Sequence, residues 1–252
     1  MTTNPQNGSS RPKVVLVHGA FAESASWDGV IEILQERGYT AIAAPNYLRS
    51  LSGDAEFVAS VLDSIEGPVV LVGHSYGGSV ISGAALRREN VRAMVFVAAF
   101  APEEGESIGE LSGLYPGSTL GETLKFVPLP DGTTDLYIRR EEYHQQFAAD
   151  VPAGQAASMA ATQRPLRDVA LNEGSGSPAW RDVPSWFVIP GLDKNVPSEA
   201  QRFMAERAGA REILEIEDAS HAVPASRADE VADVILAATA HVEQLAQNQP
   251  AR

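Results

Sequence analysis

The sequence predicts an α/β fold in which helices flank a mostly parallel β-sheet. Short runs rich in β-branched residues alternate along the chain with segments whose apolar residues recur at helical spacing. The connections between these segments are short, which implies right-handed β-α-β crossovers and therefore parallel strands. The length of 252 residues is ordinary for one α/β domain.

Four strands are predicted in the first hundred residues, and a helix follows each of the first three. The expected strands are residues 13–18, 39–44, 68–72 and 91–99. The expected helices are residues 27–37, residues 54–65, and a third helix from a glycine-rich turn to about residue 88. Ser26 can cap the first helix and Gly38 can end it. The run KVVLVH is typical of a strand buried in a parallel sheet.

The alternation of strands and helices stops after the fourth strand. Residues 101–180 contain many Pro and Gly residues, with a predicted hairpin near Asp131–Gly132 and helices near 140–149 and 154–163. The pattern resumes with a strand at 185–189, a helix at 198–208, a strand at 211–216 and a helix at 224–246. We therefore expect a flexible tail over 1–12, one domain over 13–246 with an insertion at about 101–180, and a frayed tail over 247–252.

The composition excludes several classes of function. Asp and Glu total 33 against 19 Lys and Arg, so the net charge is −14. A surface this acidic repels nucleic acid and anionic membranes, and we expect neither as a partner. The chain has no cysteine, which excludes disulfides, Cys-ligated zinc, iron–sulfur clusters and a thiolate nucleophile.

No targeting or membrane-spanning segment is expected from the sequence. The first eleven residues are polar and contain no apolar core of a signal peptide. The longest stretch without charged residues, 67–86, holds five glycines, a proline and a histidine. Because a spanning helix needs sustained apolarity, this stretch is interpreted as a strand, a turn and a helix. We expect a cytoplasmic protein, in keeping with the absence of cysteine.

The motif Gly73-His74-Ser75-Tyr76-Gly77 fits the G-x-S-x-G nucleophile elbow. A strand that turns sharply into a helix forces the central residue into a strained conformation with positive φ, and the two glycines prevent a clash between the strand and the helix. The elbow presents the serine at the carboxyl edge of the sheet, where the helix N-terminus stabilises negative charge. The VVLV run before the motif and the apolar segment after it supply the expected context.

A serine nucleophile needs a base, and the base needs a carboxylate. His221 is the predicted base because it follows the last strand, in agreement with the Ser…Asp…His order known for this elbow. Asp193 follows the strand at 185–189 and is the favoured acid, since it lies at the same sheet edge as Ser75. Asp218 is an alternative, although two groups this close on one loop usually point apart. Asp182 precedes its strand and would lie at the wrong edge.

An oxyanion hole normally needs two backbone N–H groups. Tyr76, the residue after the nucleophile, is expected to supply one of them. The second is expected from the loop after the first strand, at Ala20 or Phe21, where Gly19 lets the backbone approach closely.

The insertion leaves the sheet at its carboxyl edge, where open α/β sheets bind their ligands. We therefore expect it to roof the pocket and to supply an apolar wall. The predicted wall residues are Leu114, Tyr115, Phe126, Leu129, Tyr143, Phe147 and Met159.

Metal and cofactor motifs are weak or missing. Glu141 and His144 have the spacing of one half of a carboxylate di-metal site, but no second copy exists. The sequence contains no H-E-x-x-H motif, no P-loop and no G-x-G-x-x-G fingerprint. Neither a metal nor a cofactor site is predicted.

Four segments resemble the α/β-hydrolase superfamily: KVVLVHGAF, VVLVGHSYGG, VFVAAFAPEEGES and SHAVP. The chain is most similar to the small esterase branch that includes plant methylesterases, hydroxynitrile lyases and bacterial pyrethroid-hydrolase-like carboxylesterases. The resemblance extends from residue 13 to about 240 and is weakest in the insertion, which corresponds to the cap of that family. It implies the α/β-hydrolase fold, no cofactor and a serine-hydrolase triad of Ser75, Asp193 and His221.

Two positions separate the branches of this family. Its hydroxynitrile lyases carry a Lys directly after the catalytic His and a Thr directly after the His of the first loop, where this chain has Ala222 and Gly19. We therefore expect a hydrolase for small to medium, largely apolar carboxylic esters, acting as a monomer or a homodimer. The alternatives are a lactone or thioester hydrolase, a lyase on the same triad, and a small-molecule receptor that retains a triad.

Overall fold

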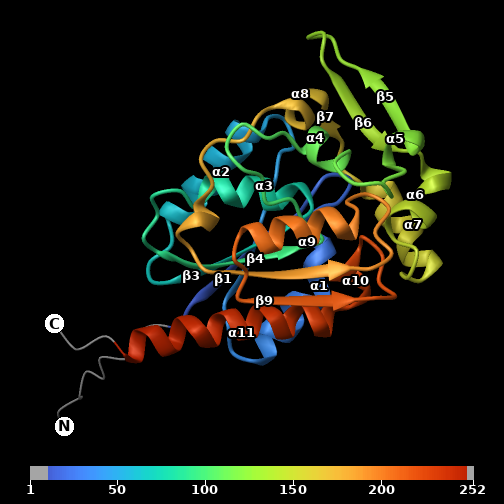
Figure 1. Cartoon of the computed structure of the whole chain (residues 1–252). Helices are drawn as coiled ribbons and strands as arrows, with labels where there is room; N and C mark the ends of the chain where they lie inside the picture. The colour runs from blue at the N-terminus through green and yellow to red at the C-terminus, as the bar shows by residue number, and fades with distance from the viewer. Residues whose placement is uncertain (1–10, 249–252) are drawn as a thin grey trace.

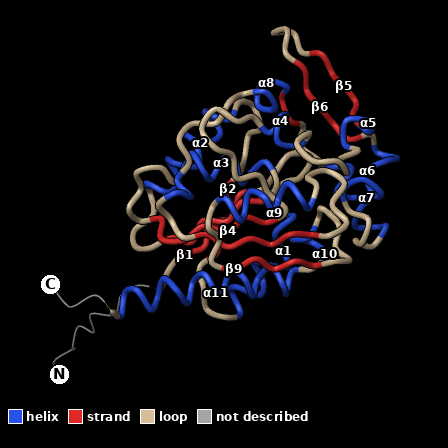
Figure 2. The backbone as a smooth tube through the Cα atoms, viewed as in Figure 1, coloured by secondary structure: helices blue, strands red, loops and turns tan. Residues whose placement is uncertain are grey.

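The computed structural model describes residues 11–248, and its centre is a six-stranded sheet in which every pair of neighbouring strands is parallel (Figures 1 and 2). The strand order is β2-β1-β3-β4-β8-β9. The strands are β1 (Lys13–Val17), β2 (Ala41–Ala44), β3 (Val69–His74), β4 (Val91–Val97), β8 (Ser185–Pro190) and β9 (Glu212–Ile216). The predicted parallel α/β fold is confirmed.

Helices cover both faces of this sheet. In Figure 1, α11 (Ala228–Gln247) runs beneath the sheet, while α2 (Leu51–Asp63), α3 (Tyr76–Ala84) and α9 (Ser198–Arg207) lie above it. Helix α1 (Asp28–Glu36) packs beside α11. Alternate strand residues enter two separate cores, as the two-residue period of a strand requires. In β3, Val70 and Val72 face α1 and α11, whereas Val69 and Leu71 face α2 and α3.

The chain reverses its direction across the sheet between β1 and β3. From β1 it moves to the edge strand β2, and it then crosses back to β3 on the other side of β1. Ligands of open α/β sheets bind outside the carboxyl ends of the strands at such a reversal. The loops that follow β1 and β3 therefore lie side by side at the expected position of a binding site.

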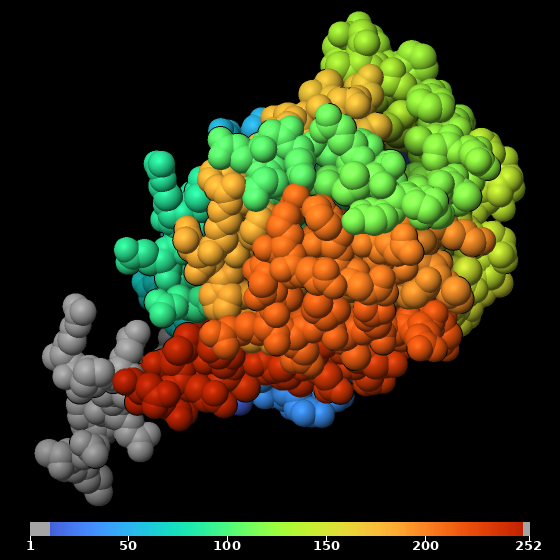
Figure 3. All heavy atoms as spheres, in the orientation of Figure 1, coloured from blue at the N-terminus to red at the C-terminus, as the bar shows by residue number. Residues whose placement is uncertain are grey.

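The insertion between β4 and β8 forms a cap with its own three-stranded sheet, in the order β5-β6-β7. Its elements are α4 (Ile108–Ser112), α5 (Leu120–Thr123), β5 (Leu124–Pro128), β6 (Thr134–Ile138), α6 (Arg140–Phe147), α7 (Ala153–Thr162), β7 (Leu166–Arg167), α8 (Asp168–Asn172) and the 3₁₀ turn η2 (Ala179–Arg181). Strands β5 and β6 form the predicted hairpin, which projects from the body as the tip at the top of Figure 3.

Several element boundaries differ from the sequence predictions for local reasons. Ser26 does not cap a helix, because its Oγ donates to the Glu23 carbonyl at 2.7 Å inside the 3₁₀ turn η1 (Ser24–Trp27), and α1 begins only afterwards. Helix α2 begins earlier than predicted, because the Ser50 Oγ caps it by accepting the Gly53 N–H at 3.2 Å. The predicted final helix is divided into α10 (Val223–Ser226) and α11.

Residues 1–10 and 249–252, which make up most of the two predicted tails, lie outside the described residues. Arg11 is the first described residue, and its guanidinium donates to the carbonyls of Arg37 and Gly38 at 3.1 and 3.3 Å. Helix α11 continues to Gln247, one residue into the segment expected to be frayed. Over residues 11–248, none of the helices combines the length and the apolarity needed to cross a bilayer.

Candidate active site

Ser75 lies at the sharp turn between β3 and α3, in a strained conformation. Its φ is 54° and its ψ is −124°, a region that residues with a Cβ rarely occupy. The Ser75 N–H donates to the Val97 carbonyl at 3.1 Å, and the Ser75 carbonyl accepts the N–H of Phe100 at 3.2 Å. The turn also needs a glycine at position 73, where a Cβ would lie 2.6 Å from the Gly77 carbonyl oxygen.

The loop after β1 passes directly over Ser75. A Cβ on Gly19 would lie 2.6 Å from the Ser75 Cβ and 2.8 Å from the His74 carbonyl oxygen, so only glycine permits this approach. The pairing of β1 with β3 sets the two loops side by side. Ala20 and Phe21 consequently line the same cavity as Ser75 and Tyr76.

His221 and Asp193 form a buried hydrogen-bonded pair at the same edge of the sheet. The Nδ1 of His221 lies 2.7 Å from Oδ2 of Asp193, and both side chains are almost completely buried. The two residues follow the adjacent strands β9 and β8. With Nδ1–H bonded to the carboxylate, Nε2 is the free acceptor of a neutral imidazole, which is the tautomer a general base needs.

Three further donors hold the Asp193 carboxylate. Its Oδ1 accepts the backbone N–H groups of Asn195 at 2.7 Å and Val196 at 3.0 Å, and its Oδ2 accepts Nε2 of Gln201 at 2.9 Å. Asp218, the alternative acid, is instead exposed and paired with Arg227 at 2.8 Å. The carboxylate bonded to His221 is therefore that of Asp193.

Ser75 and His221 line one small cavity of about 50 Å³ between the sheet and the cap. Most of its lining is apolar, and leucines from the cap predominate. The lining comprises Ala20, Phe21, Ser75, Tyr76, Phe100, Ile108, Ser112, Leu120, Leu124, Leu136, Leu166, Leu171, Asn195, Val196 and His221. An apolar cavity that contains a serine and a histidine fits an apolar ligand with a polar reacting centre.

The structure distinguishes between the two candidates for the second oxyanion donor. The Phe21 N–H already donates to the Arg164 carbonyl at 3.0 Å, which favours Ala20. Tyr76 is the first residue of α3, so its N–H has no acceptor within the helix. The Tyr76 hydroxyl donates to Oδ2 of Asp54 at 2.8 Å, which anchors the side chain below the backbone donor.

Two more buried histidines support the site, and sequence reasoning did not find their contacts. The Nε2 of His74 lies 3.0 Å from the His221 carbonyl oxygen, and the two rings are 4.8 Å apart. The Nδ1 of His18 lies 2.9 Å from the Gly19 carbonyl oxygen, and the Nε2 of His18 accepts the Asn46 N–H at 3.1 Å. Burial holds the pKa of His74 well below its usual value and lowers the pKa of His18 to about 4. Both rings are therefore neutral.

The choice of residues for the predicted apolar wall is wrong, since none of the seven lines the cavity that holds Ser75. Leu114 and Phe126 are 52% and 62% exposed. Leu129 follows the exposed hairpin strand, and Tyr115 packs near Phe203 of α9.

The other three predicted wall residues lie behind or beside the cavity. Phe147 is buried and packs edge-on against the His221 ring, with ring centroids 4.8 Å apart. Tyr143 is buried beneath the loop after β1, where its hydroxyl contacts the Phe21 carbonyl. Met159 and Tyr143 both border a separate groove beside α7.

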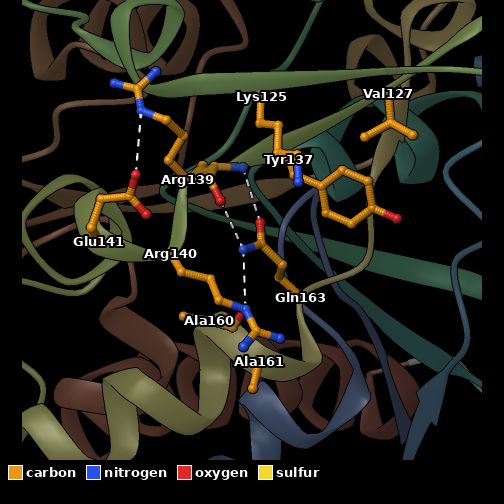
Figure 4. A pocket seen from close by; sticks show the side chains of 10 residues that line it. Lys125, Val127, Tyr137, Arg139, Arg140, Glu141, Ala160, Ala161 and Gln163 are labelled. Atoms are coloured by element: carbon orange, nitrogen blue, oxygen red, sulfur yellow. Dashed lines mark hydrogen bonds and ion pairs between the residues drawn. The ribbon is translucent and has the colours of Figure 1, made fainter.

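A second, larger cavity of about 520 Å³ lies on the cap between the hairpin and helices α6 and α7 (Figure 4). Lys125, Arg139 and Arg140 contribute its cationic groups, and Nε2 of Gln163 donates to the Ile138 carbonyl at 2.9 Å. Its lining contains no serine, histidine or aspartate, so it has no partners for the chemistry suggested by Ser75 and His221.

The chain is similar in sequence to known proteins. A sequence profile described as the alpha/beta hydrolase family matches residues 14–234. The chain is 26% identical over 264 residues to "Esterase PIR7B" of Oryza sativa subsp. japonica, covering 91% of this chain and 96% of that protein.

Two solved structures share the fold. Polyneuridine aldehyde esterase matches with a TM-score of 0.78 at 20% identity, over 90% of this chain and 99% of that one. A pyrethroid hydrolase from Sphingobium faniae JZ-2 matches with a TM-score of 0.74 at 21% identity, over 92% and 98%.

Replacing His18 with Asn is predicted to flatten the acid side of the pH–stability profile. In the folded chain His18 takes up a proton only near pH 4, against 6.5 for an unperturbed histidine. Between these values the unfolded chain binds more protons, so the free energy of unfolding of the wild type falls as the pH is lowered. His18 alone accounts for about 2–3 kcal/mol of that loss near pH 4.5. Urea titrations near pH 7.5 and pH 4.5 measure the free energy of unfolding of the wild type and of His18→Asn. An equal loss in the two proteins between these pH values would contradict the prediction.

Proposed function

The chain belongs to the alpha/beta hydrolase family, and we propose that it hydrolyses carboxylic esters through an acyl-enzyme intermediate on Ser75. The observation that carries the proposal is the buried His221–Asp193 pair at 2.7 Å, with His221 lining the same apolar cavity as the elbow serine. The names of its relatives support the proposed reaction, since they include esterases and a pyrethroid hydrolase.

The first half of the reaction transfers the acyl group to the protein. His221 Nε2 takes the hydroxyl proton of Ser75 as Oγ attacks the ester carbonyl, and Asp193 stabilises the imidazolium that forms. The negative oxygen of the tetrahedral intermediate accepts hydrogen bonds from the backbone N–H groups of Tyr76 and Ala20. As the intermediate collapses, His221 returns the proton to the departing alcohol.

The second half regenerates the serine. His221 takes a proton from a water molecule, which attacks the acyl carbonyl, and the same two N–H groups hold the second oxyanion. His221 then protonates Ser75 Oγ, and the carboxylic acid is released. Each half of the reaction leaves His221 neutral, and the complete cycle restores the Ser75 hydroxyl, so every proton transfer of the proposed cycle is carried out by residues of the chain and the attacking water.

The proposed substrates are small to medium, largely apolar esters. The cap supplies the apolar side of the cavity through Ile108, Leu120, Leu124, Leu136 and Leu166, and these side chains offer no polar partner for a charged acyl group. The volume of about 50 Å³ lies far below the few hundred Å³ of typical ligand pockets. Short acyl groups therefore fit with the least displacement of the leucines.

Ser75→Ala and His221→Ala are each predicted to reduce kcat for a chromogenic acetate or butyrate ester by roughly 10⁴-fold or more. The double variant should be little worse than either single one, because the two groups act in the same proton transfer. Stopped-flow and steady-state assays measure the burst and the turnover. Losses that multiply in the double variant would contradict a shared role, and a normal rate in Ser75→Ala would overturn the proposed function.

Asp193→Asn is predicted to lower kcat by roughly 10⁴-fold, since the amide no longer holds the required His221 tautomer. Asp218→Asn is the matched control, because Asp218 contacts Arg227 and not His221, and it should leave kcat within about twofold. Thermal unfolding of both variants separates a lost orientation from a lost fold. If Asp218→Asn were the damaging change, Asp193 would not be the catalytic acid.

Leu124→Ala is predicted to shift the ester preference towards longer acyl chains, because it enlarges the cavity that holds Ser75. A change of this size in an apolar pocket alters the kcat/KM ratio of two esters by about tenfold or more. Leu129→Ala is the matched control, since this half-buried leucine of the same hairpin does not line the cavity. The ratio of octanoate to acetate turnover measures the effect, and equal ratios in the two variants would contradict the assignment of the wall.

A further inference from the structure

Phe21, in the loop that carries the proposed oxyanion donor Ala20, has an unfavourable backbone conformation. Its φ is +60°, in the left-handed region that glycine adopts freely and that residues with a bulky side chain avoid. The side chain is 4% exposed. Such a conformation persists only where the surrounding structure determines it, so the contacts of Phe21 decide how the loop is shaped.

The cap holds both backbone polar groups of Phe21. The N–H of Phe21 donates to the Arg164 carbonyl at 3.0 Å, in the segment between α7 and β7. The carbonyl of Phe21 accepts the hydroxyl of Tyr143, on α6, at 2.8 Å. Two hydrogen bonds on opposite sides of one residue fix its φ and ψ, and therefore fix the direction of the preceding peptide units.

The Tyr143 hydroxyl is a permanent donor in this contact. Its side chain is fully buried, and burial raises the pKa of Tyr143 far above its usual value, with the charge of Glu23 adding to the shift. The protonated hydroxyl points its hydrogen at the Phe21 carbonyl. Tyr143 does not line the cavity of Ser75, so the contact is separate from any contact with substrate.

Helix α6 also contacts the loops of the proposed acid and base. Gln146 donates through Nε2 to the Lys194 carbonyl at 2.8 Å, beside Asp193. The Phe147 carbonyl accepts the N–H of Ala222 at 2.9 Å, directly after His221. Neighbouring residues of one cap helix therefore contact three of the segments that carry proposed catalytic groups, namely the loops of Ala20, Asp193 and His221.

We propose that Tyr143 is a positioning residue of the oxyanion hole: its hydroxyl holds Phe21 in the left-handed conformation that aims the Ala20 N–H at the reacting oxygen. The inference rests on the proposed function. The Tyr143 hydroxyl acts through the loop, since it donates to Phe21 and Tyr143 does not line the cavity of Ser75. The Tyr143 ring also stacks on Phe147, which packs against His221, and a change that removes only the hydroxyl keeps this ring contact. The effect of the hydroxyl is therefore largest where negative charge develops on the oxygen, in the transition state, and small in the complex with the neutral ester.

Tyr143→Phe removes only the hydroxyl and tests the proposal. We expect kcat for a chromogenic butyrate ester to fall by about 10- to 100-fold with KM within about threefold, the scale of a catalytic group that is misplaced but not lost. Tyr137→Phe is the matched control, because Tyr137 is a cap tyrosine at the cavity of Figure 4, away from Phe21. It should retain the wild-type kcat and KM.

A trifluoromethyl ketone provides the second readout. Ser75 Oγ adds to its carbonyl, the serine proton passes to His221, and the resulting hemiketal oxyanion occupies the hole without any leaving group. In Tyr143→Phe the Ki of this ketone should rise by the same factor as kcat/KM falls. A smaller folded fraction would lower kcat without changing Ki, so the comparison remains valid if the variant is less stable.

The outcomes separate this inference from the proposed function. If wild type neither turns over esters nor binds the ketone, the proposed function is wrong and the inference falls with it. If wild type does both, and Tyr143→Phe matches it in kcat and Ki, only the role of Tyr143 is wrong. A loss of kcat with an unchanged Ki also overturns that role, because the hydroxyl would then be supporting the fold and not the oxyanion hole.

Discussion

The strained conformation of Ser75 is the constraint on which the arrangement of the site depends. A φ of 54° persists because hydrogen bonds hold both backbone polar groups of Ser75. Its N–H is bonded to β4 through Val97, and its carbonyl accepts two N–H groups, from Phe100 and from Gly78 of α3. The stability of the parallel sheet and of α3 thus offsets the backbone strain at Ser75, which is of order 1–3 kcal/mol. The same turn leaves no space above Ser75 except for a glycine loop, which is what Gly19 provides.

The core of the fold could be predicted because local sequence encodes it, and the proposed reacting groups were chosen from the same local patterns. A strand such as VVLVGH is buried on both faces, so its composition alone identifies it. The elbow needs glycine and serine at fixed spacing, and the positions of Asp193 and His221 follow from the strands before them. The cap could not be resolved in the same way. Its helices α4 and α5 have five and four residues, too few to show a helical period, and tertiary contacts decide which side chains face Ser75.

The polar supports of the site escaped prediction for a related reason. Asn46 bonds to His18 across 28 positions and Gln146 bonds to Asn195 across 49, so no local pattern marks either pair. Hydrophobic reasoning also assigned Tyr143 and Phe147 to the pocket wall because they are large and apolar. Both are buried behind the site, where an aromatic body fills the space between α6 and the loops and a hydroxyl can still find a partner.

Burial has two separate effects at the proposed site. It keeps the supporting histidine His74 neutral, and it strengthens the attraction between His221 and Asp193. It keeps His74 neutral beside His221, at 4.8 Å between the rings. A cation at His74 would repel the imidazolium that forms on His221 in the proposed cycle, whereas a neutral ring can donate to the His221 carbonyl without opposing that charge. The buried carboxylate of Asp193 lies on the other side of the imidazole, with its own hydrogen bonds satisfied by Asn195, Val196 and Gln201. Low-dielectric surroundings suppress the protonation of His74. The same surroundings strengthen the attraction between the His221 imidazolium and the Asp193 carboxylate.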